Sequence, residues 1–139
     1  MSKSNLSLDF SEPIAIFSDS RISKEELSAF LRSIGAVSGE SSSFLGRLSE
    51  QDKHIWISIS NEELEYLEVS TREAVAQHLK DEPKTCIVLE LSSATGTEQL
   101  MIKFATAFAE NWSCVILGFT EGSKIYTVQE LRKDLESEI

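Results

Sequence analysis

The sequence is poor in cysteine, histidine and proline, with two of each in 139 residues. Two cysteines with no C-x-x-C pair provide neither a disulfide scaffold nor a four-thiolate metal site. We expect Cys86 and Cys114 to be buried, reduced thiols, although a disulfide between neighbouring strands stays open. His54 and His78 belong to separate predicted elements and to no H-x-x-x-H or H-E-x-x-H motif. We therefore expect no metal and no cofactor.

The sequence also lacks long apolar runs. None approaches the ~20 residues of a membrane-spanning helix, and the first ten residues have no signal-peptide core. No repeat, linker or low-complexity segment divides the chain. These absences predict a single domain over residues 1–139 and a cytoplasmic location.

Basic side chains are scarce, with 13 Lys and Arg against 23 Asp and Glu, for a formal net charge of −10. Such a charge repels nucleic acid and anionic lipid surfaces. It attracts a basic protein partner and accelerates that association. The simpler interpretation, that the acidity serves solubility alone, stays open.

What the sequence does contain is a clear strand, helix, strand pattern in residues 85–120. Residues 86–92 form a short, branched, apolar run, residues 95–112 carry apolar side chains at helical spacing, and residues 113–119 form the next strand. Two strands joined by such a helix are expected to run parallel.

The remaining segments predict further strands at residues 12–18, 43–49, 53–60 and 124–126, and helices from residue 23 to Gly35, over 61–82 and from residue 127. Capping boxes of the form S/T-x-x-E are expected to begin helices at Ser23, Thr95 and Thr127. Another at Ser70 predicts a break near Val69. The order predicts an α+β fold with a mixed sheet and helices mainly on one face. It opens with the ferredoxin-like β-α-β-β-α-β arrangement, followed by extra α-β-β-α elements.

Side chains alternate along the strand at residues 53–60. Three isoleucines there are expected to face the helices, which places His54 and Trp56 on the other face of the sheet, near Arg47 and Glu90. An aromatic ring among charged groups on an open surface has the composition of a binding hot spot. The alternative is that the N-terminal arm covers Trp56 with Leu6, Leu8 and Phe10.

Residues 61–82 are strongly acidic, with seven acidic side chains against two basic ones. Glu62, Glu65 and Glu68 recur every three residues, so a helix would place them in one exposed strip beside Glu63. We interpret these four glutamates as candidates for binding a basic partner. The alternative is that they stabilise a helix N-terminus through its dipole.

No arrangement for catalysis stands out. The turn at residues 92–97 lies between a strand and a helix N-terminus, where anions bind, but it contains neither G-x-x-x-x-G-K nor G-x-G-x-x-G. Cysteine catalysis needs an exposed, activated thiolate, whereas both thiols are expected to be buried. The prediction is that the protein is not an enzyme.

One pattern extends over roughly the last two-thirds of the chain. It comprises Gly46-Arg47-Leu48 and Ile55-Trp56-Ile57 in the hairpin, then Trp112-Ser-Cys-Val-Ile-Leu117, and finally Gly122-Ser-Lys-Ile-Tyr126 before a capped helix. This pattern resembles small acidic bacterial proteins encoded beside polymorphic toxins. The resemblance implies an immunity protein of a contact-dependent growth inhibition system, which neutralises one cognate toxin. It carries over no site residues.

Three hypotheses follow. The first is stoichiometric occlusion of a basic toxin domain, such as a nuclease, by the acidic strip and the Trp56 face. The second is a ferredoxin-like module that binds a small ligand or forms a homodimer. The third is a metabolic enzyme, which would need a cleft with strongly shifted titrating groups.

Overall fold

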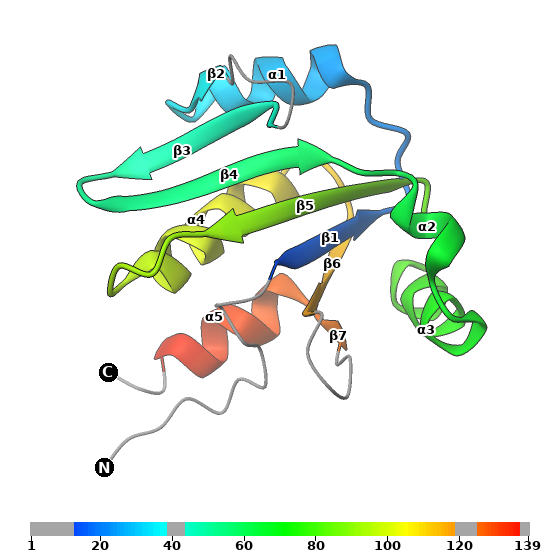
Figure 1. Cartoon of the computed structure of the whole chain (residues 1–139). Helices are drawn as coiled ribbons and strands as arrows, with labels where there is room; N and C mark the ends of the chain where they lie inside the picture. The colour runs from blue at the N-terminus through cyan, green and yellow to red at the C-terminus, as the bar shows by residue number, and fades with distance from the viewer. Residues whose placement is uncertain (1–12, 39–43, 119–124, 137–139) are drawn as a thin grey trace.

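The computed structural model describes residues 13–38, 44–118 and 125–136 (Figure 1). These ranges contain, in order, β1 (Ile14–Ser18), α1 (Lys24–Ser33), β2 (Val37–Ser38), β3 (Gly46–Glu50), β4 (Lys53–Ile59), α2 (Glu63–Tyr66), α3 (Val69–Leu79), β5 (Thr85–Leu91), α4 (Thr97–Ala109), β6 (Cys114–Gly118), β7 (Ile125–Tyr126) and α5 (Val128–Glu136). The predicted arm over Trp56 and the turn after residue 120 lie outside them. No helix in these ranges is long and apolar enough to cross a membrane.

The strands form one seven-stranded sheet in the order β2-β3-β4-β5-β1-β6-β7. The α+β class predicted from the sequence is confirmed. Every neighbouring pair is antiparallel, so the expectation of a mixed sheet was wrong. The two strands joined by α4 do run parallel, but β1 lies between them and pairs antiparallel with both.

A ferredoxin-like order is present, although not in the first four predicted strands. It consists of β4-β5-β1-β6, in which β5 lies between β1 and β4, and β1 lies between β5 and β6. The hairpin strand β3 is an addition outside this unit, as is the short β2, which the sequence did not predict. The helical segment α2–α3 takes the place of a tight turn between β4 and β5.

Helices cover the two faces of the sheet unequally, as predicted. On one face, α1, α4 and α5 enclose the larger core, where Phe30, Phe104 and Phe108 pack edge to face or tilted. On the other face, α2 and α3 cover β1, β6 and part of β5 through a smaller cluster around Phe17 and Val75, against which Ile125 of β7 also packs. Figure 1 shows α2 and α3 at the end of the sheet where β4 finishes and β5 begins. The part of this face formed by β3 and β4 has no helix over it within the described residues.

Two of the four predicted capping boxes are present. Ser23 and Glu26 exchange reciprocal side-chain to backbone hydrogen bonds of 3.0 and 3.1 Å, and so do Thr127 and Glu130 at 2.9 and 3.1 Å.

The capping box predicted at Thr95 is wrong. Gly96 adopts a positive φ of 91° and directly precedes α4, so the helix begins at Thr97. This φ favours glycine, since a side chain at Gly96 would be strained there.

The capping box predicted at Ser70 is also wrong, although the predicted helix break is real. Leu67 and Glu68 are extended, with ψ of 137° and 147°. The second helix therefore begins at Val69, and Ser70 lies inside its first turn.

Candidate functional site

The predicted acidic region forms a bend between α2 and α3. We call its exposed surface the acidic elbow and define it as Glu62, Glu65, Tyr66, Glu68 and Val69. All five side chains are exposed, and Tyr66 and Val69 are exposed to 79% and 72%. These two are the most exposed of the large hydrophobic residues in the described part of the chain. The elbow is therefore an acidic surface with a protruding aromatic ring at its centre.

The predicted single helical strip of glutamates was wrong. Glu62 precedes α2, Glu65 lies within it, and Glu68 belongs to the extended link before α3. The chain bends between them, so the three carboxylates follow the elbow instead of one helix face. Glu63 differs from the others because it is half-buried and close enough to Cys86 to help raise the pKa of that thiol.

Contacts beneath the elbow fix its position. Leu64 is buried against the smaller core, and the Asn61 side chain accepts a hydrogen bond of 2.9 Å from the backbone of Cys86 on β5. The Arg72 guanidinium on α3 donates from Nη1 to the Leu64 carbonyl at 2.6 Å. It also lies 3.4 Å from Glu82. Arg72 therefore joins the last turn of α2 to α3.

Among the described residues, the elbow carboxylates have no cationic partner. The ion pairs among the described residues are Arg72–Glu82, Lys84–Asp81 and Lys103–Glu50, and none includes Glu62, Glu65 or Glu68. Arg72 on α3 is already bonded to the Leu64 carbonyl and to Glu82. The negative charge of the elbow is thus directed to solvent and available to a cation.

Trp56 projects from the face of β4 that is turned away from the larger core, as predicted. The strand register places Arg47 beside it on β3 and Glu90 beside it on β5, so all three side chains project from the same face. Trp56 is half-buried, and its ring contacts those of Phe44 and His54 at centroid distances of 6.4 and 5.8 Å. Arg47 and Glu90 are exposed. The structure thus brings Trp56, His54 and Glu90 together and leaves them separate from the elbow.

His54 makes the contact closest to catalytic chemistry. Its Nδ1 lies 2.7 Å from the Ser49 hydroxyl, which is the spacing of a nucleophile and a base. Within the described residues, however, no third group bonds the other ring nitrogen, and the pair lies on the surface of the hairpin instead of in a cleft. Ser49 is a hydrogen-bond partner of His54 here.

The two cysteines are free and lie on opposite faces of the sheet. Cys86 is opposite Phe17, and Cys114 is opposite the next residue, Ser18. With β1 between them, the strands are about 10 Å apart, beyond the reach of a disulfide. Burial raises the pKa of each thiol to about 12. Both are therefore neutral thiols at pH 7. Cys86 is buried, as predicted, whereas Cys114 is only half-buried.

The turn before α4 uses its hydroxyl groups internally. Thr97 Oγ1 donates to the Ala94 carbonyl at 2.6 Å and lies 3.2 Å from the Ser92 hydroxyl. Ser92 Oγ also accepts from the backbone of His54 at 3.0 Å. These hydrogen bonds within the chain account for the hydroxyl groups of Ser92 and Thr97. Across the described ranges, no three His, Cys, Asp or Glu side chains gather as metal ligands.

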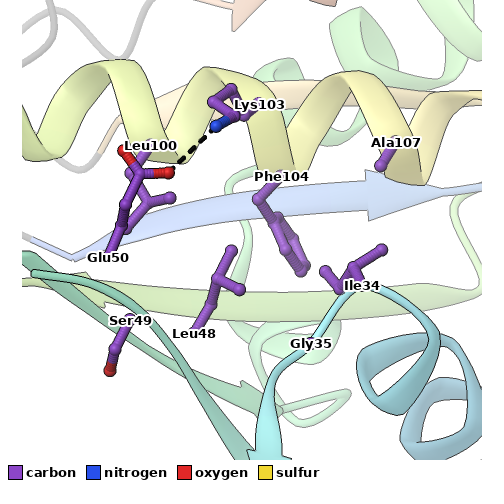
Figure 2. Close-up of a pocket in the computed structure, with 9 residues that line it drawn as sticks. All are labelled: Ile34, Gly35, Leu48, Ser49, Glu50, Leu100, Lys103, Phe104 and Ala107. Atoms are coloured by element: carbon purple, nitrogen blue, oxygen red, sulfur yellow. Dashed lines mark hydrogen bonds and ion pairs between the residues drawn. The ribbon is translucent and has the colours of Figure 1, made fainter.

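A groove of about 440 Å³ lies between β3, α4 and the end of α1 (Figure 2). Its apolar surface comes from Ile34, Leu48, Leu100, Phe104 and Ala107. At its rim, Lys103 Nζ lies 2.9 Å from a carboxylate oxygen of Glu50.

This contact sets the ionisation of Glu50. The hydrogen bond from Lys103, and then its charge, hold the pKa of Glu50 below its ordinary value.

Ser49 points away from the groove in Figure 2. The groove is thus an apolar surface bounded by one cation and one anion.

The chain was compared with protein-family models, with curated proteins and with solved structures. None of the three comparisons finds a match. Function therefore has to be inferred from these surfaces.

Sequence reasoning missed Tyr66 and Val69, although a signal was present. In a helix, Tyr66 lies two residues after the buried Leu64 and so points to the opposite side. Val69 lies five residues after Leu64 and two after Leu67, so helical spacing also directs it away from the apolar face.

Proposed function

We propose that this chain is a stoichiometric inhibitor that binds a basic protein through the acidic elbow, in the manner of an immunity protein that neutralises a toxin domain. The proposal places the protein in the cytoplasm, where it would hold the toxin inactive. It assigns no reaction to the chain itself.

The observation that carries the proposal is the composition of the elbow. Tyr66 is exposed to 79% and is bordered by carboxylates that have no cationic partner among the described residues. Exposed aromatic rings that become buried on binding are typical hot-spot residues. Charges around them steer the partner and set the association rate.

The chemistry suits a nuclease as the target. An enzyme that holds a phosphate backbone needs a basic surface, and carboxylates at 62, 65 and 68 offer it anionic oxygens in place of phosphate. With a net charge of −10, the chain is repelled by the nucleic acid itself and attracted by the enzyme. Occlusion of the substrate surface is the resulting mode of inhibition.

The elbow is also held in place before binding. Leu64 anchors it to the sheet, and Arg72 joins its two helices with a 2.6 Å hydrogen bond. A surface that is already ordered loses less conformational entropy on association. Because the elbow is already ordered, it can bind a partner tightly although its surface is small.

The test starts from the gene directly upstream. We expect it to encode a secreted protein with a variable C-terminal domain that stops growth when produced alone. Co-production of this chain should restore growth, and calorimetry with the purified domain should give a 1:1 complex. The double variant Tyr66→Ala, Glu65→Ala tests the elbow directly. It should bind the domain more weakly without loss of thermal stability. Absence of any complex with that domain contradicts the proposal.

A second candidate, a small-ligand module, is favoured by the groove in Figure 2. Its volume of about 440 Å³ falls within the range of ligand sites, and its rim offers Lys103 and Glu50 to a ligand with a charged head and an apolar body. Phenylalanine and octanoate are suitable probes. Either should shift the NMR signals of Leu48 and Phe104, and Ala107→Phe, which fills the groove, should abolish the shift. Unchanged spectra at millimolar probe contradict this candidate.

A further inference from the structure

The open part of the sheet carries a row of three side chains with opposite charges at its ends. Arg47, Trp56 and Glu90 occupy neighbouring positions on β3, β4 and β5. Both charged residues are exposed, and neither forms an ion pair within the described residues. The row thus reads cation, aromatic ring, anion across the sheet.

Such a row is complementary to itself. We propose that two copies of this chain pair face to face through Arg47, Trp56 and Glu90, with Trp56 against Trp56 at the centre and each Arg47 opposite the other copy's Glu90. This inference does not depend on the proposed toxin partner.

The geometry selects one orientation. A two-fold axis parallel to the strands and passing by Trp56 exchanges the two sides of β4, so β3 of one copy faces β5 of the other. An axis across the strands would place Arg47 against Arg47. Face-to-face sheets pack about 10 Å apart. An arginine and a glutamate side chain can together span such a gap.

The charges of the row favour a second copy over a partner whose charges all have one sign. A purely basic partner would meet Arg47, and a purely acidic one would meet Glu90, with like charges in either case. In the two-fold pair, both contacts are attractive and each occurs twice. The ring of Trp56, already in contact with Phe44 and His54, would lose its remaining exposure.

The pairing also uses a part of this face that has no helix over it within the described residues. On β5, α2 and α3 pack over Cys86 and Val88, whereas Glu90 further along the strand is exposed. The second copy would lie over β3, β4 and this end of β5.

The experiment is sedimentation equilibrium of the full chain from about 1 µM to about 300 µM, a range that covers micromolar dissociation constants. Salt at about 0.15 M screens the net charge of the two copies beyond roughly 8 Å. Wild-type protein should sediment as a monomer–dimer equilibrium. Arg47→Glu and Glu90→Arg should each raise the dissociation constant at least about tenfold, because each places like charges at both contacts.

The double variant Arg47→Glu, Glu90→Arg should return the dissociation constant to within about threefold of wild type, since it restores both pairs. Matched controls are Arg132→Glu on α5 and Glu110→Arg after α4, both exposed and outside the row. They should leave dimerisation unchanged. A wild-type monomer at all concentrations, including one with the N-terminal arm over Trp56, overturns the proposal, as does a double variant no better than the singles.

Discussion

The two thiols lie on either side of β1 and titrate far from neutrality, with pKa values raised to about 12 by burial. An unfolded thiol loses its proton near pH 9, whereas these hold theirs when folded. Their contribution to stability is therefore complete below pH 9 and is lost as the pH rises toward 12.

We predict that the free energy of unfolding falls between pH 9 and pH 10.5 more steeply in wild type than in the double variant Cys86→Ala, Cys114→Ala. The excess slope should approach about 1.4 kcal/mol per pH unit for each thiol. Urea denaturation at several pH values measures both slopes. Equal slopes would mean that the thiols ionise in the folded chain.

Two serines with the same sequence signature differ in their surroundings. Ser23 caps α1 through bonds to Glu26, whereas Ser70 lies inside α3. We predict that Ser23→Ala destabilises the fold by about 1 kcal/mol. Ser70→Ala should have no effect or stabilise slightly, since alanine has the higher helix propensity. Chemical denaturation measures the free energy of unfolding of both variants. If Ser70→Ala destabilised the fold as much as Ser23→Ala, Ser70 would act as a helix cap, contrary to the structure.

The sequence predicted alternation at residue scale well. His54 and Trp56 share one face because side chains alternate along a strand, whereas Glu90 joins them through the pairing of β5 with β4. Tyr66 and Gly96 were harder. The motif at Ser70 predicted the helix break but not the exposure of Tyr66 before it, and the motif at Thr95 did not predict the positive φ of Gly96.

At the scale of elements, α2 and α3 act as one unit because Arg72 bonds across their junction. The sequence indicated two helices but not this brace, since the bond is made to a backbone carbonyl and leaves no pattern. We predict that Arg72→Met speeds amide hydrogen exchange in residues 64–69 about tenfold.

Lys103→Met is the matched control, because it removes another surface ion pair without touching the elbow. It should leave exchange in residues 64–69 unchanged. Mass spectrometry of the exchanged peptides reports both variants. Unaltered exchange in Arg72→Met would show that packing of Leu64 alone holds the elbow.

The order of strands was beyond sequence reasoning. The length of α4 correctly predicted that β5 and β6 run parallel, but any strand can be inserted between two such strands. Here β1 occupies that position, and this makes the whole sheet antiparallel. Long-range pairing of this kind depends on the summed packing of both faces, not on a local motif.

At the scale of the whole molecule, the net charge of −10 and the local charge of the elbow predict different behaviour. Net charge attracts any cation from a distance, whereas a docking site requires the carboxylates to be where the partner binds. Two triple variants with equal total charge separate these effects. One is Glu62→Lys, Glu65→Lys, Glu68→Lys; the other is Glu25→Lys, Asp52→Lys, Glu110→Lys, at exposed sites outside the elbow.

The decisive measurement is the association rate constant of each variant with the proposed toxin partner as a function of salt. Docking through the elbow predicts a rate at least about tenfold lower, with a weaker salt dependence, for the elbow variant, and a much smaller loss for the scattered variant. Equal rates for the two variants would contradict it.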